Sequence, residues 1–108
     1  MKVSNMQSNA GNDVANQFII VDGSTEVFQS YDSIIAKRSP KLITKSILDD
    51  NGKCVDTYID TELKIVLDER YWDYSATTGK YRNQFLNEGI AETRKKIESG
   101  EYVLADLN

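Results

Sequence analysis

The densest group of side chains that could do chemistry is acidic and lies in the second half of the chain. Alternate residues of an extended strand point to the same side, about 7 Å apart. Asp56, Tyr58, Asp60 and Glu62 would therefore form one strip, with about twice the axial spacing of phosphates along one DNA strand. Such a strip could imitate a nucleic-acid backbone and occupy a basic groove of another protein. Residues 54–76 carry six carboxylates against two basic side chains, and the six are Asp56, Asp60, Glu62, Asp68, Glu69 and Asp73.

These acidic residues have a simpler interpretation, and a basic group offers a different one. The same strip is typical of the solvated outer face of a one-sided sheet. Basic residues around Pro40 could contact phosphate or protect an edge strand from pairing with other molecules. Basic residues among the aromatic side chains of 71–82 resemble a surface on which bases stack, although we expect Trp72 itself to anchor the core. The basic set that would bind nucleic acid is Lys37, Arg38, Lys41, Lys80 and Arg82.

Most catalytic chemistry is excluded by composition. The chain has no histidine and one cysteine, Cys54, which rules out Ser-His-Asp and Cys-His triads and His/Cys zinc sites. Glu62-Leu63-Lys64, with an upstream aspartate, fits an acid-x-Lys nuclease motif that is short enough to arise by chance. Asp49-Asp50-Asn51-Gly52 lacks the glycine and glutamate spacing of a calcium loop. The sequence therefore predicts no catalytic residue, no metal ligand and no cofactor.

Bulk properties describe one small acidic domain. The chain has 108 residues, 40% of them hydrophobic, and a net charge of -4, whereas dedicated nucleic-acid binders are usually basic. No stretch approaches the roughly 18 apolar residues that would span a bilayer, and polar residues follow Lys2 where a signal peptide would be apolar. The single cysteine fits a reducing compartment. We expect a cytoplasmic protein without a membrane partner.

Hydrophobic patterning predicts an α+β fold. Residues 1–16 follow no period and read as a flexible polar arm, whereas residues 17–108 read as a single domain. The domain would contain an antiparallel sheet of five to six strands, including one Asn-Gly hairpin, packed with two C-terminal helices. A strand within 33–37 is expected to end before Pro40. The remaining elements are strands at 17–21, 26–31, 61–68 and 102–104, and helices at about 77–87 and 90–99.

The hairpin has the strongest local signal. Asn51-Gly52 lies between two runs that can pair, and residues 41–60 form the predicted hairpin. A type I′ turn would place Ser46 opposite Thr57, Ile47 opposite Asp56, and Leu48 opposite Val55. A longer loop with a glycine bulge would shift this register.

One stretch resembles a known group of proteins. Residues 67–86, Leu-Asp-Glu-Arg-Tyr-Trp-Asp-Tyr-Ser-Ala-Thr-Thr-Gly-Lys-Tyr-Arg-Asn-Gln-Phe-Leu, resemble the C-terminal module of an uncharacterised family of small proteins from bacteriophages and mobile elements. The similarity extends to residues 28–37 and 99–102. Residues 1–16 and the piece from 40 to 60 lie outside that pattern, and the second reads as an inserted hairpin. The family has no established activity, so the resemblance carries over no catalytic residue.

A phage origin would imply a function in contact with the host. Small acidic phage proteins without catalytic chemistry commonly bind and block host machinery. The resemblance therefore implies an anti-CRISPR-like inhibitor in the bacterial cytoplasm, whose partner is a CRISPR effector or another nucleic-acid-binding complex of the host. Its binding surface would be Asp56, Tyr58, Asp60 and Glu62. The alternative is a nucleic-acid-binding accessory or regulatory protein of the phage or mobile element, which would use the basic set.

Overall fold

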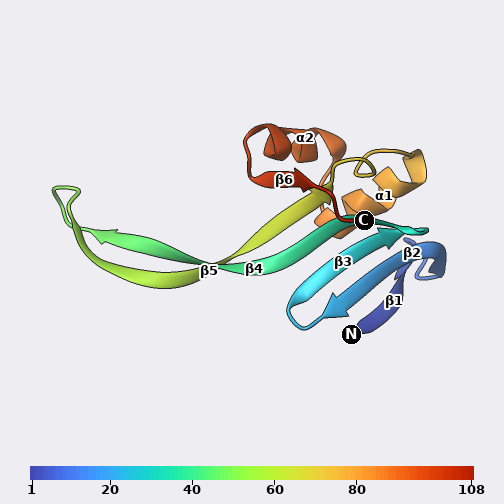
Figure 1. Cartoon of the computed structure of the whole chain (residues 1–108), viewed down its shortest axis with the longest axis horizontal. Coiled ribbons are helices and arrows are strands. Elements are labelled where there is room, and N and C mark those ends of the chain that lie inside the picture. The colour runs from blue at the N-terminus through green and yellow to red at the C-terminus, as the bar shows by residue number, and fades with distance from the viewer.

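Turns and five strands alternate through the first two thirds of the chain, and a sixth strand after the helices completes one six-stranded sheet (Figure 1). The structure is a computed structural model that describes all 108 residues. Neighbouring strands follow the order of the sequence, and the first four pairings are antiparallel, whereas β5 and β6 are parallel. The α+β class is confirmed, and the sheet is mixed. The strands are β1 (Lys2–Gln7), β2 (Asp13–Asp22), β3 (Thr25–Ser30), β4 (Ser33–Leu48), β5 (Cys54–Asp68) and β6 (Tyr102–Ala105).

Both predicted helices are present and cover one side of the sheet. Helix α1 (Ala76–Leu86) begins after Ser75, whose Oγ accepts a hydrogen bond from the Thr78 amide, and helix α2 (Ile90–Glu98) follows. Helix α1 packs its aromatic side chains on the sheet, where Phe85 stacks on Phe28 with ring centroids 5.9 Å apart. The buried hydrophobic core is Met6, Phe28, Ile35, Ala36, Leu67, Tyr81, Phe85, Leu86 and Tyr102, with Trp72 packed against it.

The prediction of a flexible N-terminal arm is wrong, because residues 2–7 form the edge strand β1. Val3 pairs with Ile20 of β2, and Met6 is buried in the core. The Asn5 side chain donates a hydrogen bond to the Val14 carbonyl oxygen at 2.9 Å. An edge strand can be stabilised by backbone pairing and one buried side chain, so its polar residues show no hydrophobic period.

The prediction that a strand ends before Pro40 is also wrong. Strand β4 continues through Pro40, which pairs with Leu63 of β5. The neighbouring strand β3 pairs with β4 only as far as Arg38, so Pro40 lies where β4 has a partner on one side only. Proline is tolerated at such a position because the strand has an unpaired edge there.

The long strands β4 and β5 draw the molecule out in one direction. Its extents are 55 × 29 × 29 Å, and its radius of gyration is 16.9 Å, against about 13 Å for a compact domain of this length. Figure 1 shows the two strands leaving the sheet as a twisted two-stranded ribbon, while both termini stay near the other strands. The predicted hairpin is therefore the outer part of two continuous strands.

The turn of this hairpin differs from the expected two-residue type. Ser46 pairs with Thr57 and Ile47 with Asp56, as predicted. Leu48 pairs with Cys54 and not with Val55 as the type I′ turn would place it, because the register shifts after Ile47, as expected of the alternative with a longer loop. The Asp49 amide donates a hydrogen bond to the Lys53 carbonyl oxygen at 2.9 Å. This bond closes a turn longer than two residues, and the longer turn shifts the register of the strands.

Candidate functional site

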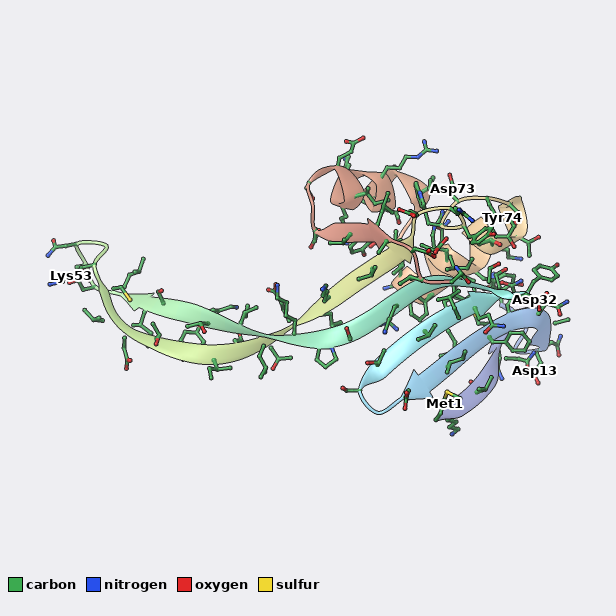
Figure 2. The ribbon with its side chains drawn as sticks, in the orientation of Figure 1. Met1, Asp13, Asp32, Lys53, Asp73 and Tyr74 are labelled. Atoms are coloured by element: carbon green, nitrogen blue, oxygen red, sulfur yellow. The ribbon has the colours of Figure 1, made fainter.

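The most exposed element is the part of β4 and β5 that leaves the sheet, which we call the projecting hairpin and define as residues 39–64. Strand β3 stops pairing with β4 at Arg38, and β6 begins to pair with β5 at Ile65. Between these limits the two strands pair only with each other, and no helix lies over them (Figure 2). Lys53 marks the tip, at the opposite end of the molecule from Asp32 and Tyr74 (Figure 2). The projecting hairpin thus offers both faces and both edges to other molecules.

The predicted acidic strip lies on one face of the projecting hairpin, but it is not purely acidic. Opposite Glu62 stands Lys41, and opposite Tyr58 stands Lys45. Cross-strand partners share a face, so two ammonium groups accompany three carboxylates there. We call this surface the charged face; it consists of Lys41, Ile43, Lys45 and Ile47 from β4, and Asp56, Tyr58, Asp60 and Glu62 from β5.

One ion pair sets the electrostatics of the charged face. The Lys45 Nζ lies 2.9 Å from the Asp60 Oδ2, and the Thr61 amide donates a hydrogen bond to the Asp60 Oδ1. The hydrogen bond from Lys45 and the one from the Thr61 amide lower the pKa of Asp60, and the same pair raises the pKa of Lys45. Both side chains are about half exposed, so water and salt screen the pair. Asp56 and Glu62 form no ion pair and keep their charge available to a partner.

The basic partners of the acidic strip are the feature that sequence reasoning missed. The signal was present, because the predicted pairing of Ser46 with Thr57 also places Lys45 opposite Tyr58. Extending the same register by four residues places Lys41 opposite Glu62. An acidic run in one strand therefore says little about a face until its neighbour is aligned with it.

At the tip, the Asp49 side chain holds the turn. The Asp49 Oδ1 accepts hydrogen bonds from the amides of Asn51 and Lys53, both at 2.9 Å, and so holds the turn. Glu62 lies at the other end of the projecting hairpin, so these acids do not meet as the nuclease motif would require. No three His, Cys, Asp or Glu side chains gather as a metal site would need.

The basic set that would bind nucleic acid is dispersed, and two of its members are already engaged. Arg38 pairs with Glu26 at 3.1 Å, donates to the Phe85 carbonyl oxygen at 2.8 Å, and lies over the Phe85 ring. Arg82 is only 1% exposed. Lys37, Lys41 and Lys80 are exposed, but the first two lie on the sheet and the third on α1. The structure therefore does not gather the five residues on one surface.

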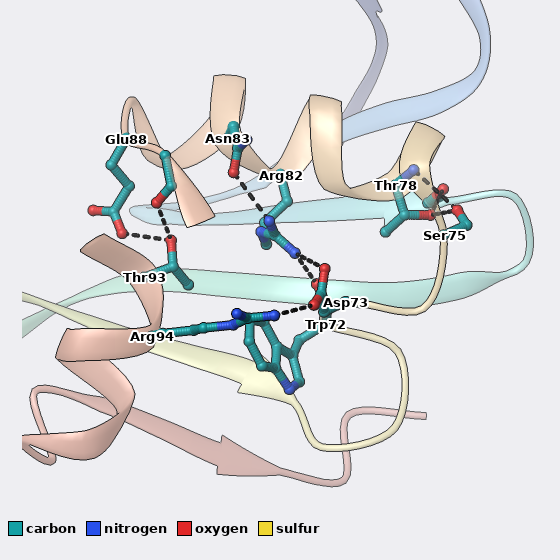
Figure 3. Close-up of polar contacts among 11 residues, drawn as sticks. Trp72, Asp73, Ser75, Thr78, Arg82, Asn83, Glu88, Thr93 and Arg94 are labelled. Atoms are coloured by element: carbon teal, nitrogen blue, oxygen red, sulfur yellow. Dashed lines mark hydrogen bonds and ion pairs between the residues drawn. The ribbon is translucent and has the colours of Figure 1, made fainter. Parts of the chain in front are cut away.

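Arg82 is the centre of a buried polar network that ties α1 to the loop before it (Figure 3). Its guanidinium donates to the Trp72 carbonyl oxygen at 2.6 Å, to the Asp73 carboxylate at 3.0 Å, and to the Asn83 side chain at 3.0 Å. It also lies over the Trp72 ring at 5.4 Å. Arg94 of α2 approaches the second oxygen of Asp73 at 3.5 Å. These contacts make Arg82 a structural residue and not a reader of bases.

An open hollow of about 660 Å³ lies beside this network, between α1 and the start of α2. Lys80 and Arg94 line it, which would suit an anion. The Asp73 carboxylate also lines it and binds both Arg82 and Arg94. Because a carboxylate of the chain already takes the anionic position, the hollow does not have the electrostatics of a free anion site.

A second buried acid, Asp68, fixes the end of β5 and the C-terminal tail. Its carboxylate accepts hydrogen bonds from the amides of Arg70, Tyr71 and Leu107 and from the Asn108 side chain, at 2.9 to 3.0 Å. Burial works to raise the pKa of Asp68, but these four hydrogen bonds outweigh it and lower the pKa below its usual range. The Asn108 side chain also pairs with both backbone groups of Ile34, as a strand neighbour would.

A third acid, Glu88, has a side chain that is 8% exposed and joins α2 to β6. It accepts hydrogen bonds from the Tyr102 hydroxyl at 2.7 Å, from Lys96 at 2.8 Å and from the Thr93 hydroxyl at 2.7 Å. Figure 3 shows the contact with Thr93. Burial, and then the hydrogen bond to Glu88, raise the pKa of Tyr102 to about 12. Arg82, Asp68 and Glu88 are thus bonded within the fold, with the Arg82 Nε alone among their polar atoms buried and without a partner, which leaves the projecting hairpin as the candidate site.

Comparison with known proteins gives one match. A protein family described as "Family of unknown function (DUF8033)" matches residues 1–101, which include β1 and the whole projecting hairpin. No curated protein and no solved structure matches the chain. Neither helix has the length and apolar character needed to cross a bilayer.

Proposed function

The chain belongs to this family of unknown function, and from that premise we propose that it is a non-enzymatic binding protein that docks its projecting hairpin on a protein partner. The observation that carries the proposal is the contrast in how charges are used. Asp68 and Arg82 are buried, the Glu88 side chain is 8% exposed, and all three are bonded within the fold, whereas Asp56 and Glu62 are exposed and form no ion pair. Charges that do not stabilise the fold are the ones free to steer and fix a partner.

The charge of the projecting hairpin favours a basic partner surface. Over residues 39–64, five carboxylates and four lysines, Lys64 among them, leave the projecting hairpin with one net negative charge. Acidic residues spaced along an extended strand suit a groove that normally holds phosphates. Occupying such a groove would exclude the nucleic acid. We therefore propose an inhibitor of a nucleic-acid-targeting defence complex, the partner class implied by the resemblance to phage proteins.

A nucleic-acid-binding function is the alternative, and it has less support. It would use Lys37, Arg38, Lys41, Lys80 and Arg82. The guanidinium groups of Arg38 and Arg82 already donate hydrogen bonds to residues of the fold. Of the remaining lysines, Lys37 and Lys41 lie on β4 and Lys80 on α1, and the chain has a net charge of -4. The experiment must therefore distinguish direct binding of nucleic acid from binding of a protein partner.

The test compares two charge reversals that are equal in size. The first variant changes Asp56, Asp60 and Glu62 to lysine, and the control changes three exposed body carboxylates, Asp13, Asp22 and Asp32, to lysine. Each immobilised chain is incubated with bacterial extract, with or without excess duplex DNA. We expect the unmodified chain and the control to retain nucleic-acid-binding proteins, DNA to displace them, and the hairpin variant to lose them.

Two results would contradict the proposal. Equal retention by the hairpin variant would show that the charged face is not the contact surface. A shift of labelled duplex DNA by the purified chain, weakening steeply as salt rises, would favour the nucleic-acid-binding alternative.

A further inference from the structure

The face of the projecting hairpin opposite the charged face carries no charge at all. Its aliphatic members are largely exposed: Leu42 by 72%, Ile59 by 71%, Leu63 by 65% and Leu48 by 59%. Hydroxyl side chains alternate with them along the two strands, and these are Thr44, Ser46, Thr57 and Thr61. We call this surface the uncharged face. Contiguous exposed apolar surface of this kind marks an interaction site more often than an inert surface.

The uncharged face continues the core face of the sheet beyond the point where the helices stop. Ala36 and Leu67 pair across β4 and β5 and are fully buried, and the alternation of side chains carries the same face outward to Leu42 and Ile59. Inside the body this face is covered by α1 and α2, but along the hairpin nothing covers it (Figure 1). The pattern that makes a core in the body is thus repeated where the chain supplies no second layer.

No other segment of the chain is placed to supply that layer. The C-terminal Asn108 is bonded to Ile34 and Asp68, and Lys2 is paired with Val21 in the sheet. Both helices are bonded to the body, α1 through Arg82 and α2 through Lys96. The occupant of the uncharged face must therefore come from another molecule.

We propose that this occupant is a second copy of the chain, whose uncharged face packs against the first in a two-fold symmetric pair of hairpins. Two such faces are chemically self-complementary, since each offers aliphatic and hydroxyl side chains and neither offers a charge to pair. Every charge of the charged face points away from the contact, so pairing two negative chains buries no like charges. The pair would leave both charged faces in water.

The size of the face fits a dimer of modest stability. Five alternate positions on each strand form a strip of about 30 Å by about 10 Å. The plan area is about 300 Å² on each copy, and side chains that stand off the strip add to it, so the contact would be a weak one below the usual range of specific interfaces, which begins at about 1,200 Å² in total. A two-stranded ribbon without a second layer is itself marginal in water, and packing against another ribbon stabilises it.

The test measures the mass of the purified chain by sedimentation equilibrium at protein concentrations up to about 1 mM. We expect the mass to rise from 12.2 kDa toward twice that value as the concentration rises. Changing both Leu42 and Ile59 to lysine should weaken dimerisation by about 100-fold, because two apolar contacts become charges. The matched control, Ile47→Lys, alters an exposed residue of the charged face and should leave the dimer intact.

Several results would overturn the inference. These are a monomeric mass at every concentration, a dimer that the Leu42→Lys/Ile59→Lys variant retains, or a dimer that Ile47→Lys disrupts. Sedimentation of the monomeric chain with phosphatidylcholine vesicles would assign the uncharged face to a lipid surface instead. Circular dichroism of each variant checks the fold, which the substitutions should not disturb since the side chains are exposed. The measurement uses the chain alone, so it does not depend on the proposed host partner.

Discussion

The body and the projecting hairpin use the same kinds of side chain in opposite ways. In the body, Arg82, Asp68 and Glu88 are almost completely removed from water, and each makes at least three hydrogen bonds to neighbouring residues. In the hairpin, Lys45 and Asp60 form an ion pair that water reaches from outside. The body thus uses its charges to hold its elements together, whereas the hairpin presents them.

This difference has an energetic consequence. A buried charge that loses its partners is costly, because no water replaces the lost hydrogen bonds. An exposed charge that loses its partner is rehydrated at little cost. Substitutions in the body should therefore change stability, and substitutions in the hairpin should change binding.

The largest expected effect is on Arg82. Replacing it with methionine keeps most of the volume but removes the hydrogen bonds to Trp72, Asp73 and Asn83, so the free energy of unfolding should fall by about 3 kcal/mol. Urea denaturation followed by tryptophan fluorescence measures this directly. The control is Lys80→Met on the exposed side of the same helix, which should change the free energy by less than about 0.5 kcal/mol. Equal losses of unfolding free energy in the two variants would show that the buried charge contributes no more to stability than an exposed one.

The second effect is on Asp68 and depends on pH. The pKa of Asp68 is lower in the folded chain than the usual value of about 3.9, so its carboxylate stabilises the fold above that pH. This contribution disappears as the pH falls through the lowered pKa of the folded state. Asp68→Asn should reduce the free energy of unfolding by about 2 kcal/mol at pH 7 and by less at low pH. Urea denaturation between pH 7 and pH 2 tests this, and a difference that stays constant with pH would contradict it.

The helices and the hairpin were predictable from sequence because local signals determine them. Ser75 caps α1, Asn51-Gly52 marks the turn, and Gly100, with a φ of +83°, follows the end of α2. Strand β1 was not predictable in this way. Its single buried residue, Met6, gives no period, and its pairing with β2 depends on a neighbour that the local sequence does not identify.

The candidate site was only half predictable for a related reason. Alternation along one strand is a local property, so it correctly placed Tyr58 and Glu62 on one face. The charge of that face is a property of two strands, and it required the register that brings Lys45 beside Asp60. The role of Arg82 had a usable signal, since it shares the buried side of α1 with Thr78 and Phe85 at helical spacing.

A smaller effect is expected at Glu88. Glu88→Gln removes the carboxylate that accepts from Tyr102, so the raised pKa of Tyr102, about 12, should fall toward 10, while burial keeps it above that value. A raised tyrosine pKa stabilises the fold below pH 10, and this contribution disappears as the pH rises through 12. Absorbance titration at alkaline pH should show one of the six tyrosines ionising late, and earlier in the variant. If the pKa of the late tyrosine were the same in the variant, burial alone would account for its raised value.

The smallest effect on stability is expected in the hairpin, where Lys45→Ala should leave the urea midpoint unchanged within error, because the ammonium group is exposed and its pair with Asp60 is screened. The same substitution makes the charged face more acidic by one charge. If the face meets a basic groove, Lys45→Ala should strengthen capture of the partner, whereas Asp60→Ala should weaken it, with both variants equally stable. Denaturation and partner capture, measured on the same two variants, separate the two properties. A loss of stability in either variant would show that the hairpin, like the body, depends on its charges to hold its shape.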